Sequence, residues 1–283
     1  MTDFQKYLDQ FIDNAIREDV GDGDHSSLCC IPAEAIDKAQ LIIKEDGILA
    51  GVDVAYEVFK KLDPEVKFEK LINDGTAVKK GDIAFRVQLH TRSLLLAERL
   101  VLNIMQHMSG IATATNVYVK RLEGTNTHVL DTRKTTPGMR LLDKLAVKIG
   151  GGVNHRIGLF DMIMLKDNHN DFAGGMAQAI QRAKDYLKAN NKDLKIEVEV
   201  RNLDELQIAL NAGGVFRIML DNFDIPTTKK AVEIINHKCE TESSGGITLE
   251  TLRDYAECGV DYISVGALTH HVSSLDMRLK AFK

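Results

Sequence analysis

The chain has 283 residues, of which 44% are hydrophobic, a size that predicts one large domain or two modest ones with a sizeable core. The formal net charge of −5 excludes a general nucleic-acid-binding surface, and the lack of any run of 18 apolar residues excludes a membrane span. The four cysteines lack C-x-x-C spacing, so we expect no disulfide framework and no zinc site, and we expect a reducing, cytoplasmic location.

The first part of the chain predicts a small α+β unit. Residues 1–20 place apolar and charged side chains at helical spacing, which is typical of an amphipathic helix and not of a signal peptide. Short β-type runs follow at residues 39–43, 66–72 and 83–89, with a helix near 54–62. A long helical pattern over residues 94–122 is expected to break at Ser109-Gly110, where we place the passage into a second domain.

Beyond residue 125, short strands alternate with helices, which is the pattern of βα units around a parallel sheet. Six strand candidates occupy residues 128–131, 162–166, 196–200, 217–221, 238–242 and 261–265. In a βα barrel the carboxyl ends of such strands gather at one mouth, where these enzymes keep their sites. An open doubly wound sheet would collect the same ends along one edge, so position alone leaves both architectures open.

The segment from residue 131 to residue 169 gathers positive charge against the trend of the chain. It contains seven Lys and Arg side chains and four Asp side chains, which leaves a local balance of +3. Four of these cations are candidates for binding carboxylates or phosphates, namely Arg133, Lys134, Arg156 and Lys166. Arginine suits bidentate carboxylate recognition and lysine acts as a point charge. The alternative is that these cations are ordinary solvated surface charges. Their position beside glycine-rich turns and strand ends disfavours that alternative.

The run Ile196–Val200 alternates, so its two glutamates face one side and its aliphatic residues face the other. Two carboxylates inside a barrel are costly unless they meet cations or a metal. Glu199, nearer the carboxyl end, is the better functional candidate, and Glu197 is expected to be an internal salt-bridge partner. We expect Asp221 to join Glu199 near Mg2+, a hard cation that often shares oxygen ligands with a substrate phosphate. A buried ion pair with Lys166 is the alternative.

Two turns of small residues follow the last two predicted strands. They are Ser243-Ser244-Gly245-Gly246 and Ser264-Val265-Gly266, and the first precedes a helix expected to begin near Leu249. Backbone N–H groups in such turns and at helix N-termini form phosphate cradles, although a single turn of this kind is a weak signal. His155 adjoins Arg156 in a glycine-rich segment, yet a lone histidine is more often structural. No spacing indicates a Ser-His-Asp or Cys-His arrangement, so nucleophilic hydrolysis is set aside.

With these motifs in view, the chain resembles the quinolinate phosphoribosyltransferases, also called nicotinate-nucleotide pyrophosphorylases (carboxylating). The resemblance runs over nearly the whole chain. Its motifs are Glu98-Arg99, Asn103, Ser109-Gly110-Ile111-Ala112-Thr113, Asp131-Thr132-Arg133-Lys134-Thr135, Gly151-Gly152-Val153-Asn154-His155-Arg156, Lys166-Asp167-Asn168-His169, Glu197-Val198-Glu199, Leu220-Asp221-Asn222, Glu242-Ser243-Ser244-Gly245-Gly246 and Val265-Gly266-Ala267-Leu268-Thr269. So many motifs in the same order are highly specific.

The resemblance implies an α/β protein with the type II phosphoribosyltransferase fold. An N-terminal α/β sandwich would occupy residues 1–110, and an open six-stranded βα barrel would occupy residues 111–269, with residues 270–283 packing back on the sandwich. It also implies a homodimer, or a higher oligomer, in which each sandwich covers the barrel mouth of the partner.

The implied reaction joins quinolinate to 5-phosphoribosyl-1-pyrophosphate with Mg2+ and gives nicotinate mononucleotide, pyrophosphate and CO2, a step of de novo NAD biosynthesis. By resemblance, Arg133, His155 and Arg156 fall on quinolinate-binding positions, and Arg99 matches an arginine delivered by the neighbouring subunit. Positions associated with the phosphoribosyl pyrophosphate and its metal are Lys134, Lys166, Glu199 and Asp221. The phosphate-loop positions are Ser244, Gly246 and Gly266.

Two other functions stay open on the residues alone. A phosphoribosyltransferase for nicotinate or another planar acid would keep the same phosphate-binding residues. A barrel lyase would use Lys166 as a Schiff-base nucleophile. A non-enzymatic anion-binding protein is disfavoured, because it gives no reason for acids that face the barrel interior beside the cations.

Overall fold

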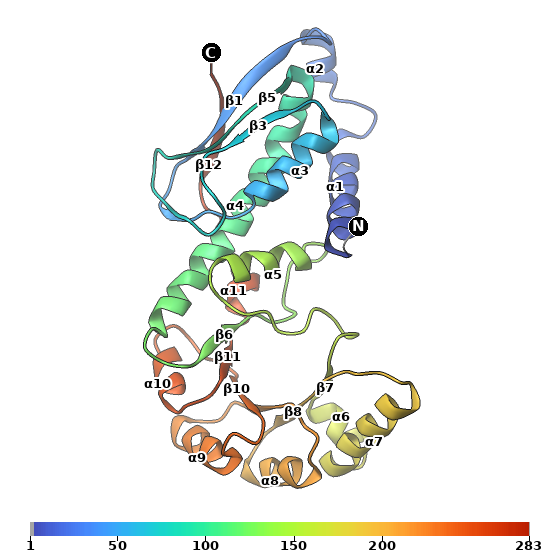
Figure 1. The fold of residues 1–283 in the computed structure, drawn as a ribbon, viewed down its shortest axis with the longest axis vertical. Coiled ribbons are helices and arrows are strands. Elements are labelled where there is room, and N and C mark those ends of the chain that lie inside the picture. The colour runs from blue at the N-terminus through green and yellow to red at the C-terminus, as the bar shows by residue number, and fades with distance from the viewer. Residues whose placement is uncertain (1–2, 283) are drawn as a thin grey trace. The chain divides into compact units, whose positions relative to one another are not determined.

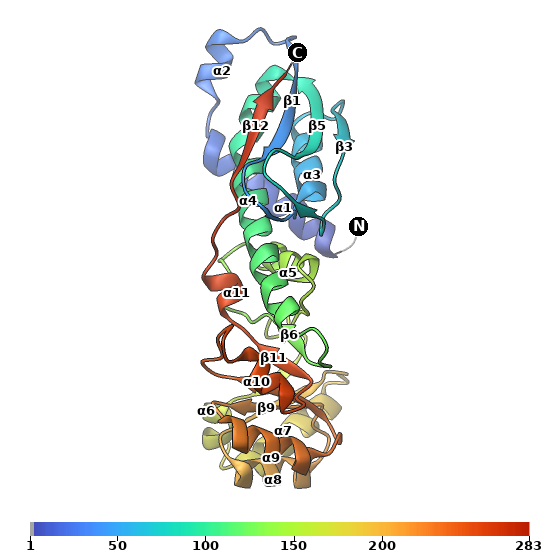
Figure 2. The ribbon, with the colours of Figure 1, turned by 90° about the vertical axis from the view of Figure 1, so that its left-hand side faces the viewer.

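The structure, a computed structural model, describes residues 3–282 and contains two compact units (Figure 1 and Figure 2). Unit 1 comprises Met1–Asn116, Thr135–Gly151 and Leu268–Lys283, and unit 2 comprises Val117–Lys134 and Gly152–Ala267. The chain therefore passes between the units more than once. Met1 and Thr2, which the predicted first helix includes, lie outside the described residues, as does Lys283.

Unit 1 is built from helices and short antiparallel strands. Its elements are α1 (Asp3–Val20), α2 (His25–Cys30), β1 (Ile36–Ile43), β2 (Gly47–Ile48), α3 (Val52–Leu62), β3 (Lys67–Lys70), β4 (Ala77–Val78), β5 (Ile83–His90), α4 (Thr91–Arg121), α5 (Arg140–Ile149) and β12 (Met277–Ala281), with most of α11 (Ala267–His270). The three β-type runs and the helix expected near 54–62 all form, as β1, β3, β5 and α3.

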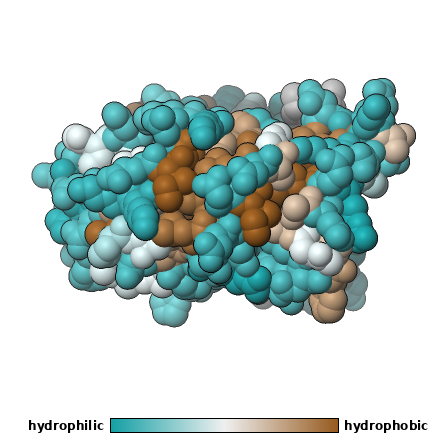
Figure 3. Space-filling model, turned by 90° about the horizontal axis from the view of Figure 1, so that it is seen from below, coloured by the Kyte–Doolittle hydropathy of each residue, from teal (hydrophilic) through white to brown (hydrophobic). Residues whose placement is uncertain are grey.

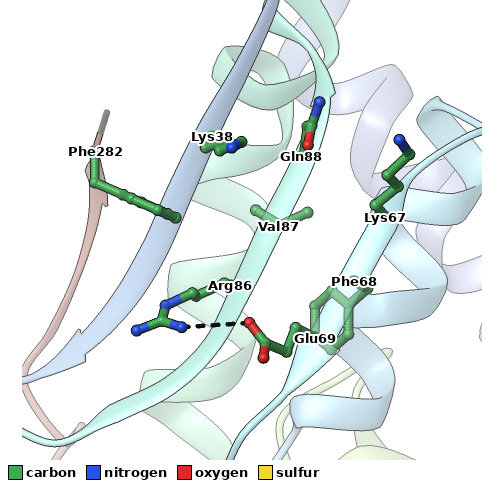
Figure 4. Close-up of a pocket in the computed structure, with 8 residues that line it drawn as sticks. All are labelled: Lys38, Lys67, Phe68, Glu69, Arg86, Val87, Gln88 and Phe282. Atoms are coloured by element: carbon green, nitrogen blue, oxygen red, sulfur yellow. Dashed lines mark hydrogen bonds and ion pairs between the residues drawn. The ribbon is translucent and has the colours of Figure 1, made fainter.

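The main sheet of unit 1 has the order β12-β1-β5-β3, so the C-terminal segment supplies an edge strand. Leu41 of β1 lies opposite both Leu279 and Phe85, and these apolar side chains are buried. The Phe59 ring of α3 packs edge-on to the Phe85 ring at 5.9 Å. Side chains on the other face of this sheet line a hollow of about 370 Å3. In that hollow the Arg86 guanidinium contacts the Glu69 carboxylate at 3.5 Å (Figure 4).

Helix α4 runs without interruption through Ser109-Gly110, so the predicted break there is wrong. The Ser109 hydroxyl accepts a hydrogen bond from the Ala50 amide at 2.8 Å and donates one to the Ala50 carbonyl at 3.1 Å. A Cβ atom at Gly110 would lie 2.2 Å from the Ser273 carbonyl oxygen. The small residues are therefore required for close packing of the helix against neighbouring segments, and they do not end it.

Unit 2 contains the predicted parallel sheet. Its strands are β6 (His128–Leu130), β7 (Ile163–Leu165), β8 (Ile196–Val200), β9 (Arg217–Asp221), β10 (Glu240–Ser244) and β11 (Tyr262–Ser264). Its helices are α6 (Asp167–Phe172), α7 (Met176–Ala189), α8 (Leu203–Ala212), α9 (Ile225–Ile235) and α10 (Leu252–Glu257). All six strand predictions are confirmed, although β10 begins two residues later than expected and α10 begins three residues after Leu249.

The six strands pair in the order β6-β11-β10-β9-β8-β7, and each pair is parallel. Within residues 3–282, β6 and β7 do not pair with each other, which confirms an open barrel instead of a closed one. Because all strands point the same way, their carboxyl ends share one side of the unit.

Several large hydrophobic side chains are exposed on the surface of the chain. Viewed from below, apolar residues group in the middle of a mostly hydrophilic face (Figure 3). The most exposed large hydrophobic side chains are Leu159, Phe160 and Phe172, with 72%, 73% and 88% of their area open. Within the described range, no helix has both the length and the apolar character needed to cross a membrane.

Candidate active site

Strand register brings the predicted acids onto one face of the unit 2 sheet. Glu197 lies opposite Arg217 and Glu199 lies opposite Met219, so Asp221, two residues further along β9, points to the same side. On β10, Ser244 lies opposite Asp221 and therefore shares that face. The strands thus place two carboxylates and a hydroxyl close to their carboxyl ends.

Lys166 follows β7 directly and reaches the same region. Its ammonium nitrogen lies 3.0 Å from Oε2 of Glu199, an ion pair in which the acid is buried and the lysine is half exposed. The Lys166 amide donates to Nδ1 of His169, which fixes the start of α6. The ion pair that the sequence offered as an alternative therefore forms, while the ammonium group stays accessible to a ligand.

The turn after β10 is narrow. A Cβ atom at Gly245 would lie 2.2 Å from Oδ1 of Asn222, and Gly245 has φ of +104°, so glycine is required there. The Asn222 amide donates to the Ser244 carbonyl at 2.8 Å, and its side chain donates to Oδ2 of Asp221 at 2.9 Å. Gly246 also has a positive φ, and a Cβ there would meet no atom within 4 Å. Backbone groups are thus open to a ligand beside Asp221.

The donor set at these strand ends fits a hard cation. Glu199 and Asp221 offer carboxylate oxygens from neighbouring strands, and Mg2+ commonly takes one or two protein carboxylates and completes its shell with water and substrate phosphates. Lys166 contacts Glu199 through a flexible side chain, and the neutral side chain of Asn222 contacts Asp221. Other carboxylate oxygens of both acids therefore stay available.

Arg133 and Arg156 lie in the same unit and repel each other. Burial lowers the pKa of Arg156 from its usual value, and the positive charge of Arg133 lowers it further. Within residues 3–282, neither guanidinium has a carboxylate within 4.0 Å. Arg156 is held by a hydrogen bond from Nη1 to the Met162 carbonyl at 3.2 Å. Two cations held near each other in this way form a site for an anion with more than one negative charge.

A second charged group lies inside the barrel. Nε2 of His155 is 3.1 Å from Glu197 and 3.3 Å from Glu242, and Nη1 of Arg217 is 3.2 Å from Glu242 and 3.8 Å from Glu197. Burial and the charge of Glu242 raise the pKa of Glu197. Burial alone would raise the pKa of Glu242 too, but His155 and Arg217 lower it.

Within residues 3–282, His155, Glu197 and Glu242 are the one trio of His, Cys, Asp or Glu side chains spaced to hold a metal ion, with ligand atoms within 4.8 Å of one another. Arg217 already contacts both acids and supplies the compensating positive charge. Burial alone would lower the pKa of His155, but the hydrogen bonds to both acids outweigh it and raise the pKa to about 9. The group is therefore neutralised by the chain's own cations.

The remaining predicted site residues are distributed over both units. Lys134 is exposed, and its amide donates to the Thr132 hydroxyl. Gly266 is the second residue after the end of β11 (Tyr262–Ser264). Arg99 is exposed on α4, in unit 1, and within residues 3–282 it has no ion-pair partner. Three cations of the basic segment, Arg140, Lys144 and Lys148, lie on α5, which belongs to unit 1.

Sequence reasoning assigned no role to Glu242, Arg217 or Asp131. Asp131 is fully buried and accepts hydrogen bonds from the His155 amide at 2.8 Å and from the Asn154 side chain at 2.7 Å. For Arg217 and Asp131 the available signal was a charged residue beside an apolar strand run, because a buried charge requires partners, whereas Glu242 lies in a polar strand that gives no such signal.

Two family descriptions match the sequence. "Quinolinate phosphoribosyl transferase, C-terminal domain" matches residues 111–280, and "Quinolinate phosphoribosyl transferase, N-terminal domain" matches residues 24–109.

Named proteins and a solved structure are similar over most of their length. A Nicotiana tabacum protein named quinolinate phosphoribosyltransferase (decarboxylating) 1b is 45% identical over 281 residues, which cover 94% of this chain and 80% of that protein. A Bacillus subtilis protein named probable nicotinate-nucleotide pyrophosphorylase (carboxylating) is 39% identical over 272 residues, which cover 96% of this chain and 92% of that protein. The crystal structure of NadC from Streptococcus pyogenes is 39% identical, has a TM-score of 0.91, and covers 100% of this chain and 99% of that one.

Proposed function

The chain belongs to the quinolinate phosphoribosyltransferase family, and we propose how its residues share the reaction of that family. The reaction transfers the phosphoribosyl group of 5-phosphoribosyl-1-pyrophosphate to the ring nitrogen of quinolinate. It releases pyrophosphate and CO2 and gives nicotinate mononucleotide for NAD biosynthesis.

Quinolinate binds at Arg133 and Arg156, with His155 in the same pocket. The observation that carries this assignment is that neither guanidinium has a carboxylate within 4.0 Å among residues 3–282. The charge of Arg133 also lowers the pKa of Arg156, whereas the more weakly acting Glu197 and Asp161 raise it. A dicarboxylate supplies one negative charge for each arginine, whereas a monocarboxylate such as nicotinate leaves one arginine unpaired. Bidentate pairing also orients the planar ring.

The phosphoribosyl pyrophosphate binds along the strand ends. Lys134 and Lys166 supply point charges for its phosphates, and the backbone around Ser244, Gly246 and Gly266 supplies N–H donors. Glu199 and Asp221 would hold Mg2+ through their carboxylate oxygens. When bound, the ion neutralises charge on the leaving group.

The acids then act on the reacting sugar. Positive charge develops on the ribose as pyrophosphate departs, and the carboxylates of Glu199 and Asp221 stabilise that charge. After the ring nitrogen is ribosylated, the bond from the adjacent ring carbon to its carboxylate breaks and CO2 departs. The positive ring nitrogen stabilises the electron pair left on that carbon, and the carbon then takes up a proton from solvent. Lys166 shields Glu199 electrostatically until the phosphates arrive, because its ammonium group is 3.0 Å away.

The reaction assignment is tested by measuring pyrophosphate and CO2 from quinolinate and 5-phosphoribosyl-1-pyrophosphate, with and without Mg2+. Equal amounts of both products are expected only when both substrates are present. Turnover of nicotinate without CO2 release would favour the nicotinate enzyme instead. Borohydride trapping of Lys166 with a carbonyl substrate, without pyrophosphate release, would favour the lyase.

We also propose a homodimer with shared sites. Arg99 is an exposed cation on unit 1, and Leu159, Phe160 and Phe172 expose apolar area on unit 2, which is typical of a surface that a partner covers. The location in the cytoplasm stays a prediction, and the four free cysteines are compatible with it.

Mixing two inactive variants tests the shared site. Arg99→Ala and Arg156→Ala homodimers should each work poorly, because each lacks one cation for quinolinate. In a randomly exchanged heterodimer one site receives both defects and the other receives neither. With half the dimers mixed and half their sites intact, turnover should recover to about a quarter of wild type if the sites act independently. Failure to recover after verified subunit exchange would leave Arg99 as a same-chain residue.

A further inference from the structure

The segment that carries Arg156 closes on itself through one acid. Residues 156–162, which we call the Arg156 loop, lead into β7 within unit 2. Both carboxylate oxygens of Asp161 accept backbone N–H groups from the start of this loop, Oδ2 from Ile157 at 2.7 Å and Oδ1 from Gly158 at 2.9 Å. A charged acceptor makes each of these bonds stronger than a bond between neutral groups. The two residues that directly follow Arg156 are therefore fixed by an acid at the other end of the loop.

The end of the Arg156 loop also holds the arginine side chain. Nη1 of Arg156 donates to the Met162 carbonyl at 3.2 Å. The N–H of the same peptide group belongs to Ile163 and donates to the Lys195 carbonyl at 3.0 Å, so the pairing of β7 with β8 fixes the direction of the acceptor. A guanidinium has five N–H donors, and one bond to a carbonyl leaves other donors for a ligand. Asp161 directly precedes this carbonyl, so it joins the backbone beside Arg156 to the group that its side chain contacts.

Burial of apolar side chains does little to hold the Arg156 loop within the chain itself. Leu159 and Phe160, in the middle of the loop, are 72% and 73% exposed, and burial stabilises a segment in proportion to the apolar area removed from water. A Cβ atom at Gly158 would lie 2.5 Å from the Phe160 ring, so the ring lies over the loop backbone and not in the core. The conformation of the loop therefore depends on the polar contacts of Asp161 and Arg156.

The charge of Asp161 acts on Arg156 without pairing with it. Burial and the positive charge of Arg133 lower the pKa of Arg156, and the charges of Glu197 and Asp161 oppose that change. Within residues 3–282 no carboxylate lies within 4.0 Å of the Arg156 guanidinium, because the oxygens of Asp161 bind amides instead. A direct ion pair would have to break before a substrate carboxylate could bind. Asp161 thus lowers the cost of the buried cation and leaves the cation available to a ligand.

We propose that Asp161 is a positioning residue, which fixes the Arg156 loop through two amides and so holds the Arg156 guanidinium in the orientation that quinolinate meets. The proposal rests on the proposed function for the identity of the ligand. Misplacement of a substrate-orienting group by about 1 Å costs on the order of a hundredfold in rate. Asp161→Ala should therefore lower kcat/KM for quinolinate by about tenfold to a hundredfold. The KM for 5-phosphoribosyl-1-pyrophosphate should be unchanged.

A double-mutant cycle with Arg156→Lys separates positioning from an independent role. Lysine keeps the charge, so turnover stays measurable, but it has no planar fork to orient. If Asp161 acts through Arg156, adding Asp161→Ala to Arg156→Lys should lower quinolinate kcat/KM by no more than about twofold. The control is Asp185→Ala, which removes an exposed acid of α7 and should keep the wild-type value. A further loss of about tenfold or more in the Arg156→Lys background would overturn the proposal.

NMR of the guanidinium in the ligand-free protein gives a readout that does not depend on the reaction. In wild type, the bond to the Met162 carbonyl should make rotation about the Nε–Cζ bond of Arg156 slower than in exposed arginines, with the signals assigned by their loss in Arg156→Lys. Asp161→Ala should speed this rotation. Free rotation in wild type, or unchanged rotation in Asp161→Ala, would overturn the proposal. Absence of pyrophosphate and CO2 formation by wild type would instead refute the proposed function, and the rotation rates would still test the role of Asp161.

Discussion

The charged residues inside the barrel and the two strand-end cations Arg133 and Arg156 differ in whether they have an ion-pair partner within the chain. Arg217 contacts Glu197, Glu240 and Glu242 and is almost fully buried. Arg156 is also largely buried, yet its pKa is lowered, first by burial and then by the positive charge of Arg133, although Glu197 and Asp161 act in the opposite direction. Burial of a charge is costly without a partner. The interior charges are thus part of the folded structure, and the strand-end cations require a ligand.

The comparison predicts the largest effect on stability for Arg217→Met. Removing this cation takes away one of the two positive side chains that contact the buried Glu197 and Glu242, and breaking such a buried pair costs about 3–5 kcal/mol in the free energy of unfolding. Urea unfolding and the melting temperature would show the loss. The matched control is Arg201→Met, whose ion pairs with Asp171 and Glu205 are exposed and should contribute little. Similar losses in both variants would remove the distinction between buried and exposed pairs.

Glu199→Gln and Asp221→Asn should have the next largest effect, on turnover. Each removes a charge placed beside the ribose and the metal, so kcat should fall by about a hundredfold to a thousandfold and its dependence on Mg2+ should change. Quinolinate binding should be nearly unchanged. Asp193→Asn, in the exposed loop before β8, is the control and should keep wild-type turnover. Full activity in either test variant removes that residue from the site.

Arg133→Lys should have a smaller effect that distinguishes the two substrates. Lysine keeps the charge but loses the planar fork, and hydrogen bonds to charged groups contribute roughly 1.5 to 3 kcal/mol each. The kcat/KM for quinolinate should therefore fall about tenfold to a hundredfold. The kcat/KM for 5-phosphoribosyl-1-pyrophosphate should fall less. An equal loss for both substrates would contradict the assignment of Arg133 to quinolinate.

The sequence predicts the strands of unit 2 well, because their apolar runs are short and bounded by turn residues. The alternation in Ile196–Val200 also predicts that Glu197 and Glu199 share one face, and the register with β9 agrees. Local pattern fails at Ser109-Gly110, where small residues indicate a break by propensity but serve close packing in a continuous helix. Tertiary contacts override local propensity at such positions.

The interior charge group was not predictable in full from one sequence. Glu197 was expected to have a salt-bridge partner, and its partners are Arg217 on β9 and His155 in the segment between α5 and β7. Their identity depends on strand order and register, which periodicity does not specify. For the same reason the sequence marks Arg133 and Arg156 as cations but does not reveal that they act on each other.

The central claim, that strand-end cations require a ligand whereas interior cations hold the fold, is tested most directly with Arg156→Met. The melting temperature without ligand and the Kd for quinolinate by calorimetry are the two readouts. Because the substitution removes a buried charge repelled by Arg133, the melting temperature should stay at or above the wild-type value. The Kd should rise about tenfold or more. A melting temperature as low as that of Arg217→Met, or an unchanged Kd, would contradict the account.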